Sequence, residues 1–264
     1  MLKCSGHEVF DISHSKIDYL NIDSLINSLT GVEILIHAAW AGIAREDRDS
    51  IQVQEKNVVI AKNLIEACQI AQVTHVVGLG SQAEFGNQRA PFKDNHKAFP
   101  TTRYGMAKCS VHKLLQSSKI KYSWARIFSA YGEDDSRDWI FTRAIRAINK
   151  SEVLTVGPCS QLWSFTHKSD IALGIGWIID NDITEEVNLS TTEIGTLKSY
   201  LEKLQKLAGK SELIKFSQDI NRHYDIYPHT GKLYDSGWRP RVSIDEGFVR
   251  CLNRPDKLSQ TKVH

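Results

Sequence analysis

The sequence predicts an α/β fold of the doubly wound type: a parallel β-sheet covered by helices on both faces, with a smaller lobe after it. Two observations support this prediction. Over the first two thirds of the 264 residues, short apolar runs alternate with amphipathic stretches, which is the strand, helix, strand order of a parallel sheet. Beyond residue 132 the alternation becomes less regular, which indicates a separate lobe that closes over the sheet.

Each expected element follows from its local pattern. Short apolar runs bounded by polar residues predict strands at 7–12, 33–39, 74–79, 122–128 and 153–156. Apolar residues that recur every three or four positions predict helices at 22–29, 57–71, 104–117, 139–149 and 197–208. Ligands of such a fold bind beyond the carboxyl ends of the strands. We therefore expect the chemistry in the segments that follow Ala39, Leu79 and Phe128.

The composition excludes several classes of protein. Hydrophobic residues make up 41% and charged residues 24% of the chain, as in an ordinary globular domain and unlike a disordered or collagen-like chain. A net charge of +2 creates no large field for nucleic acid or an anionic membrane. The longest apolar stretch, 171–179, is about half of a membrane-spanning helix, and the first residues lack the apolar core of a secretory signal. We expect a cytoplasmic protein.

Metal and hydrolase chemistry are not indicated either. The five cysteines are scattered and form no CxxC pair, which predicts reduced, mostly structural thiols. The ten histidines show no HExxH spacing, so no metal is expected. A GxSxG elbow is not formed around Ser81, because Leu79 and Ala83 occupy the glycine positions.

Three residues suit hydride transfer at a carbonyl. Tyr104 and Lys108 are four apart on one helix and therefore share a face, and that helix can lie beside the loop that carries Ser81. The serine would hydrogen-bond the carbonyl oxygen, and the tyrosine would pass a proton to it as the hydride arrives. The lysine would lower the pKa of the phenol towards the working range.

These residues lie in stretches that resemble the extended short-chain dehydrogenase/reductases, the NAD-dependent epimerase/dehydratase family that acts on nucleotide sugars. The matching stretches run from about residue 6 to residue 249 and read EILIHAAWAG, NLIEAC, VVGLGSQAEFG, YGMAK, RIFSAYG, FTHKSDIA, VNLSTTE and GWRPRVSIDEGF. The resemblance implies a Rossmann-like cofactor lobe over 1–132, to which 160–192 returns. It implies a small substrate lobe over 133–159 and 193–264, and possible homodimerisation through the 57–71 and 104–117 helices.

The resemblance also implies roles for individual residues. The catalytic roles fall to Ser81, Tyr104 and Lys108. The cofactor would be held by Asp18 and Tyr19 at its adenine, by Ala38, Ala39 and Asn57 around it, and by Tyr104 and Lys108. The substrate would meet Gln82, Glu84, Ser129 and Trp163, with Trp163 standing where an arginine commonly holds the diphosphate. Trp163 would stack on a base or sugar, or serve as buried apolar surface.

The chain departs from the family at the start. The family's first strand and its GxxGxxG phosphate turn have no counterpart, because the match begins near Gly6 at the end of the first helix. We expect either a late start of the reading frame or a remnant with impaired cofactor binding. After the second strand, Ser13, His14 and Lys16 suit a 2′-phosphate, which favours NADPH over NAD. Asp11 would favour NAD if the register were shifted by two residues.

The catalytic loop separates the possible reactions. Sugar 4,6-dehydratases of the family carry an Asp-Glu pair after the hydroxyl residue, and here those places hold Gln82 and Ala83, so dehydration is not expected. Glu84 would be a substrate contact or a structural carboxylate. Our leading interpretation is NADPH-dependent reduction of a dTDP- or CDP-linked 4-keto-6-deoxyhexose for a bacterial surface polysaccharide, as in dTDP-4-dehydro-6-deoxyglucose reductases. The alternatives are a nucleotide-sugar 4-epimerase with tightly held NAD, and a catalytically silent binding protein.

Overall fold

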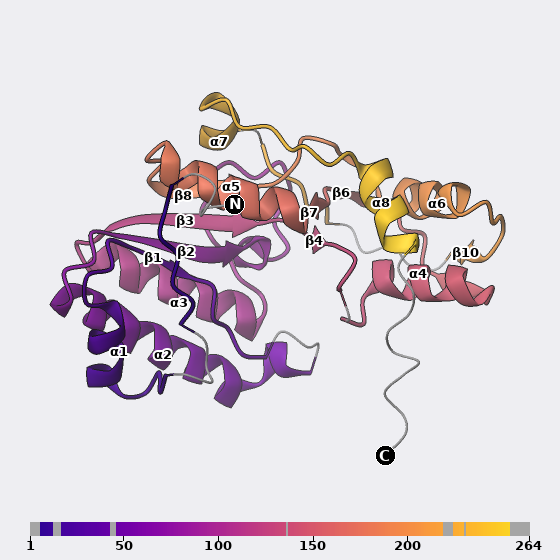
Figure 1. The fold of residues 1–264 in the computed structure, drawn as a ribbon. Helices are drawn as coiled ribbons and strands as arrows, with labels where there is room; N and C mark the ends of the chain where they lie inside the picture. The colour runs from indigo at the N-terminus through magenta and orange to yellow at the C-terminus, as the bar shows by residue number, and fades with distance from the viewer. Residues whose placement is uncertain are drawn as a thin grey trace, which may run out of the picture.

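A four-stranded parallel sheet organises the first part of the chain (Figure 1). The computed structural model describes residues 6–12, 17–42, 46–135, 137–218, 224–229 and 231–253. The strands follow the order β1-β2-β3-β8, with β1 at Ile34–His37, β2 at His75–Ser81, β3 at Lys121–Ile127 and β8 at Glu185–Leu189. Their registers are all parallel, so the carboxyl ends of the strands meet at one edge of the sheet.

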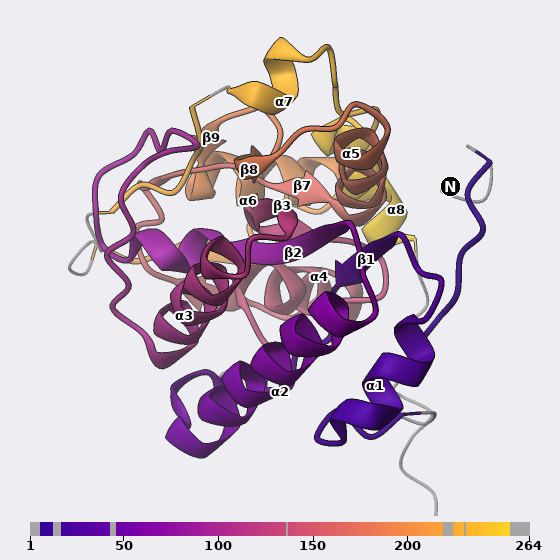
Figure 2. The ribbon, with the colours of Figure 1, turned by 90° about the vertical axis from the view of Figure 1, so that its left-hand side faces the viewer.

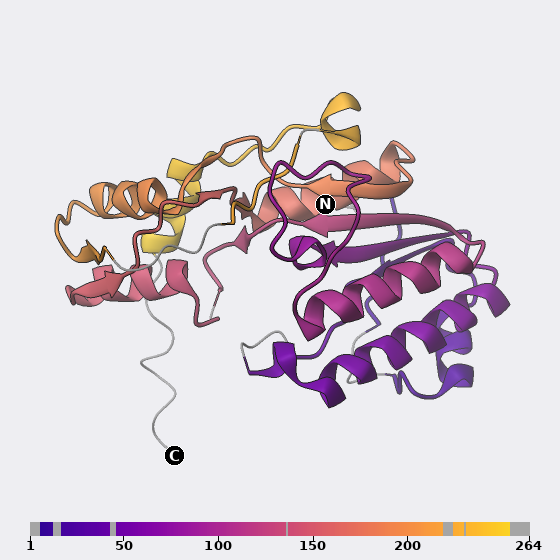
Figure 3. The ribbon, with the colours of Figure 1, turned by 180° about the vertical axis from the view of Figure 1, so that it is seen from behind.

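Helices cover both faces of this sheet (Figures 1 and 3). On one face lie α1 at Ile22–Leu29, α2 at Ile51–Ile70 and α3 at Arg103–Ser117, and on the other lies α5 at Lys168–Asp180. The first face buries an apolar cluster that includes Leu64, Val76, Val111 and Trp124. The predicted doubly wound α/β fold is therefore confirmed.

Most of the remaining elements gather at the carboxyl end of the sheet (Figure 1). Three helices, α4 at Ile140–Lys150, α6 at Leu197–Leu207 and α8 at Ile244–Leu252, pack around Phe141, Tyr200 and Phe248. Strand β5 at Leu154–Val156 pairs with β10 at Ile214–Phe216. The short pairs β4 at Ala130–Tyr131 with β7 at Thr166–His167, and β6 at Leu162–Trp163 with β9 at Gly195–Thr196, lie between the sheet and these helices. Helix α7 at Lys232–Asp235 packs against β8.

Two elements differ from their predicted form. Residues 7–12 were expected as a strand, and this is wrong: they run beside the β1 edge of the sheet but pair with no described strand (Figure 2). Their short apolar run favours extended backbone, but a strand also needs a neighbour within hydrogen-bonding distance. Helix α2 begins at Ile51 instead of residue 57, because Ser50 caps it by accepting a hydrogen bond from Val53 N.

Candidate functional site

The three predicted catalytic residues come together at the carboxyl end of β2. Ser81 is the last residue of β2, and Tyr104 lies in the first turn of α3, whose N-cap Thr102 accepts a hydrogen bond from Gly105 N. The Ser81 and Tyr104 side chains share a hydrogen bond. A Cβ on Gly105 would lie 2.4 Å from the carbonyl oxygen of Ala83, so only glycine lets α3 approach the loop this closely.

Lys108 lies one turn further along α3 and is almost fully buried. Its ammonium donates a hydrogen bond of 2.8 Å to the Leu79 carbonyl oxygen. It stands 3.5 Å from the ring centroid of Trp40 and 5.7 Å from that of Tyr104. Burial lowers the pKa of Lys108 from 10.5 to about 7, although the Glu84 carboxylate acts in the opposite direction. This side chain can therefore hold or release a proton near neutral pH.

Opposing effects act on the pKa of Tyr104. Burial raises the pKa of its phenol, while the hydrogen bond from Ser81 and the charges of Arg48 and Arg137 lower it. Burial prevails, so the phenol is protonated at neutral pH. The expectation that Lys108 lowers the pKa of Tyr104 is wrong for this structure: the pKa is raised, and Lys108, whose own charge burial disfavours, is not among the groups that lower it.

The sequence allowed Glu84 to be either a substrate contact or a structural carboxylate, and its contacts support the structural role. Its side chain is fully buried, and its carboxylate accepts hydrogen bonds from Ser81 N at 2.8 Å and from Trp124 Nε1 at 3.0 Å. It also forms an ion pair of 2.9 Å with Arg126 Nε. A buried carboxylate needs such partners. Glu84 thus fixes the loop that follows Ser81, with Gln82 to Phe85 forming the short helix η3.

The other predicted substrate residues form one hydrogen-bonded chain. Ser129 N and Ser129 Oγ both donate to Gln82 Oε1, at 2.9 and 3.1 Å, and Trp163 Nε1 donates to Ser129 Oγ at 2.6 Å. Ser129 has a φ of +31°, a backbone conformation that non-glycine residues rarely adopt and that often marks functional sites. These hydrogen bonds connect the loop after Ser81 to β6, which lies at the carboxyl end of the sheet.

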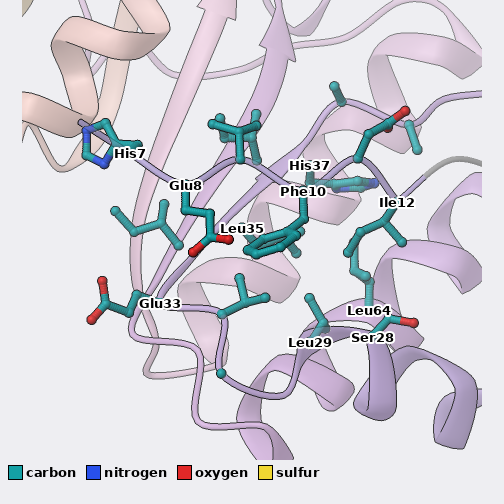
Figure 4. Close-up of a pocket in the computed structure, with 18 of the residues that line it drawn as sticks. His7, Glu8, Phe10, Ile12, Ser28, Leu29, Glu33, Leu35, His37 and Leu64 are labelled. Carbon is teal, nitrogen blue, oxygen red and sulfur yellow. The ribbon is translucent and has the colours of Figure 1, made fainter. Parts of the chain in front are cut away.

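A cavity of about 750 Å³ opens beside β1 (Figure 4). Figure 4 shows Phe10, Ile12, Leu29 and Leu64 along it, with His37 among them. The Nε2 atom of His37 is buried and has no hydrogen-bond partner among the described residues. Burial and the nearby charge of Lys108 lower the pKa of His37 to about 4, so its ring is neutral at physiological pH.

The cavity overlaps part of the predicted cofactor site. Its volume lies within the range of small-molecule sites, roughly 300–1,000 Å³, and an apolar lining with one unpaired polar atom is typical of them. Three predicted cofactor residues line it, namely Tyr19, Ala38 and Ala39. His37, which lines the cavity, is close enough to Lys108 for the charge of Lys108 to lower its pKa. No described residue forms a glycine-rich turn into a helix here.

The remaining predicted cofactor residues lie elsewhere. Asn57 holds the loop after β1, because its amide accepts from Ala41 N and donates to Ala41 O, both at 2.9 Å. The carboxylate of Asp18 accepts a hydrogen bond from Leu20 N. Ser13, His14 and Lys16 lie outside the described residues.

Three residues near Tyr104 and Lys108 were not predicted from the sequence. Trp40 lies edge-on to Tyr104 with ring centroids 5.8 Å apart, and the Arg48 guanidinium carbon stands 4.5 Å from the Tyr104 ring centroid. His37 is the third. Only its place at the end of a strand predicted to face the ligand could have pointed to His37. Arg48 lies in the short helix η2 at Asp47–Asp49, where the sequence gives no periodic signal.

In the described parts of the chain, no group of three or more histidine, cysteine, aspartate or glutamate side chains is arranged to hold a metal ion. No helix of the same residues is both long and apolar enough to cross a membrane.

Known proteins resemble both the sequence and the fold. Residues 1–190 match the family model described as NAD dependent epimerase/dehydratase family. A UDP-glucuronate 4-epimerase of Thermodesulfobacterium geofontis is 25% identical over 252 residues, which cover 90% of this chain and 77% of the relative. A CDP-abequose synthase of Yersinia pseudotuberculosis is 24% identical, over 61% of this chain and 56% of that one.

Solved structures share the fold at lower sequence identity. The structure of RMD from Pseudomonas aeruginosa complexed with NADPH superposes with a TM-score of 0.80 at 18% identity, covering 95% of this chain and 92% of that one. A UDP-glucuronic acid 4-epimerase from Bacillus cereus in complex with NAD gives a TM-score of 0.77 at 22% identity, covering 88% and 77%.

Proposed function

Because this chain belongs to the NAD-dependent epimerase/dehydratase family, we propose that it inverts a hydroxyl-bearing carbon of a nucleotide-linked hexose, as a nucleotide-sugar 4-epimerase that retains its dinucleotide. The observation that carries the proposal is the set of Ser81, Tyr104 and Lys108 without a second acid-base pair. Gln82 and Ala83 follow Ser81, and neither side chain can move the proton that elimination of water requires. The set therefore suits oxidation and reduction at one carbon.

Each residue of the site would have its own role in this reaction. The Ser81 hydroxyl, bonded to the Tyr104 phenol, would hold the sugar oxygen between the two groups. During oxidation the phenol would pass its own proton towards the neutral form of Lys108 as it takes the hydroxyl proton, and both transfers would reverse during reduction. Lys108, held by the Leu79 carbonyl oxygen, has a pKa of about 7 and can buffer that proton. A bound nicotinamide would accept and return the hydride. Tyr19, Ala38 and Ala39 would contact the cofactor along the cavity.

The relatives support the epimerase more than the reductase expected from the sequence. Those most similar over the greater part of the chain include a UDP-glucuronate 4-epimerase and a putative UDP-glucose 4-epimerase, the second from Methanocaldococcus jannaschii at 23% identity. For this activity we propose NAD as the cofactor. The NADPH preference expected from Ser13, His14 and Lys16 stays a prediction.

One observation favours a 4-ketoreductase as the second candidate. The raised pKa of Tyr104 keeps the phenol protonated, and this is the form that reduction of a carbonyl consumes. The cofactor would then be NADPH, and the product a deoxysugar nucleotide for a lipopolysaccharide O-antigen. The likeness to the CDP-abequose synthase supports that branch. A cytoplasmic location, the boundaries of the two lobes and a homodimer through α2 and α3 are proposals under either function.

Product analysis separates the two candidates. The protein is incubated with UDP-glucuronate or UDP-glucose and NAD, and in parallel with a dTDP-linked 4-keto-6-deoxyhexose and NADPH. We expect C4 epimers by NMR without net reduction of NAD. Stoichiometric oxidation of NADPH in the second reaction, with no epimer in the first, would overturn the epimerase in favour of the reductase. The Tyr104→Phe variant is the control, and conversion that survives it does not arise from this site.

A further inference from the structure

Arg48 presents a guanidinium to the catalytic tyrosine without an anion of its own. Its guanidinium carbon lies 4.5 Å from the ring centroid of Tyr104, and the side chain is half-buried. Among the described residues, no carboxylate forms an ion pair with it and no oxygen accepts a hydrogen bond from it. Arg126 and Arg137 differ, because Glu84 pairs with the first and Asp135 with the second.

The backbone that carries Arg48 is fixed from both sides. Gln54 on α2 donates from Nε2 to the carbonyl oxygens of Asp47 and Gly42, at 3.0 and 3.3 Å. On the other side, Asp49 accepts a hydrogen bond of 3.2 Å from the backbone N–H of Arg103, the residue before Tyr104. Helix η2 is thus tied to α2 and α3, and the Arg48 guanidinium lies beside the Tyr104 ring.

Cations predominate among the charged groups that act on Tyr104. Arg48 and Arg137 both act on the phenol as cations, and Lys108 adds a third group that can carry charge. The carboxylate among the groups acting on the phenol is that of Glu84, which Arg126 already pairs. Asp135 likewise pairs with Arg137. The five N–H donors of Arg48 match a carboxylate in a planar, two-pronged arrangement, better than an ammonium would.

We infer that Arg48 binds a carboxylate on the hexose, so that the site takes a nucleotide-linked uronic acid in preference to a neutral hexose. The inference rests on the proposed reaction at C4 beside Tyr104. In a hexuronate, one ring atom separates C4 from the carboxylate carbon, whereas the diphosphate is attached across the ring at C1. A cation stacked on the tyrosine is therefore positioned for the sugar carboxylate and not for the diphosphate.

The test compares two ligands that differ only at that group. Binding of UDP-glucuronate and UDP-glucose is measured by calorimetry in the Tyr104→Phe background, with NAD present, so that no turnover interferes. We expect tighter binding of UDP-glucuronate. Arg48→Gln should raise its Kd roughly tenfold or more and leave that of UDP-glucose within about twofold. Arg48→Lys should retain part of the preference. Steady-state kinetics with Tyr104 intact should show the same split in KM.

The control is Arg103→Gln, which removes an equal charge from an exposed side chain at the start of α3 and should leave both Kd values unchanged. Unfolding temperatures of all variants verify that they fold. An equal loss for both ligands after Arg48→Gln would assign Arg48 to the diphosphate, and no loss would reduce it to packing on Tyr104; either overturns the inference. Selective uronate binding by a protein that forms no C4 epimer would instead sink the proposed reaction and leave the inference standing.

Discussion

At the scale of single residues, burial sets the chemistry of the site. Lys108 and Tyr104 are both deprived of water, and in each case this stabilises the neutral form. The position of Lys108 in the sequence suggested that it lowers the pKa of the phenol. The cations that lower this pKa are instead Arg48 and Arg137. The Tyr104 phenol therefore keeps its proton at neutral pH, whereas the Lys108 ammonium gives its proton up near pH 7.

The buried ammonium predicts a pH dependence of stability. The pKa of Lys108 is about 7 in the folded protein and near 10.4 in the unfolded chain, so between these values the unfolded state binds more protons. The free energy of unfolding should consequently gain a contribution from this group as the pH rises from 7 towards 10. Lys108→Met, which removes the charge, should be more stable than the wild type at pH 6, and the difference should shrink by pH 9.

Urea unfolding of both proteins at several pH values measures this difference. A gap between the two free energies that is constant from pH 6 to 9 would mean that Lys108 keeps an ordinary pKa in the folded protein. Lys62→Met serves as the control, since this lysine lies on the exposed side of α2.

At the scale of elements, the sequence predicts helices and central strands well. Helix α1 coincides with its predicted range, and β3, α4, β5 and α6 differ by one residue at each end or less. Apolar periodicity works here because these elements bury one face against a core. It fails at the start of α2, where the polar side chains Gln54 and Asn57 are buried and hydrogen-bonded to the loop after β1. A buried polar residue looks like a surface residue in the sequence.

The close approach of α3 to the catalytic loop predicts the effect of one methyl group. Gly105→Ala would place a Cβ 2.4 Å from the Ala83 carbonyl oxygen, and backbone must move to relieve it. We expect a loss of about 1–3 kcal/mol in the free energy of unfolding and a fall in kcat, since the shift separates Tyr104 from Ser81. Gly157→Ala is the matched control, because no atom lies within 4 Å of its Cβ and stability should not fall. Equal stability of the two variants would refute this close packing.

At the scale of the whole molecule, the site lies between the parallel sheet and the elements around α4, α6 and α8. The sequence and its family resemblance placed Ser81, Tyr104 and Lys108 together, as well as Tyr19, Ala38 and Ala39 along the cavity. They did not find Arg48 or Trp40, because residues outside regular elements reach the site through the path of a loop, and spacing along the chain does not encode that path. The hydrogen-bonded chain from Gln82 to Trp163 is a tertiary feature of the same kind.

The hydrogen bonds from Gln82 through Ser129 to Trp163 predict that loss of the Trp163 donor affects substrate binding selectively. Trp163→Phe removes the indole donor to Ser129 while keeping an aromatic ring. We expect a loss of about 1 kcal/mol in stability and a several-fold rise in KM for the nucleotide sugar. Trp177→Phe is the matched control, because it removes an indole donor to Ser236 far from the site. Both variants should lose stability, but a rise in KM shared by both would deny Trp163 a role at the substrate.

The central claim is that hydride leaves and returns to one carbon of the sugar within the site, and isotope tracing tests it most directly. The protein is incubated with NAD and UDP-glucuronate that carries deuterium at C4, and the C4 epimer is examined by NMR and mass spectrometry. We expect an epimer that retains the deuterium at C4, with none in the solvent and no net reduction of NAD. Epimer that has exchanged its C4 deuterium for solvent hydrogen, or the absence of any epimer with either UDP-glucuronate or UDP-glucose, would contradict it.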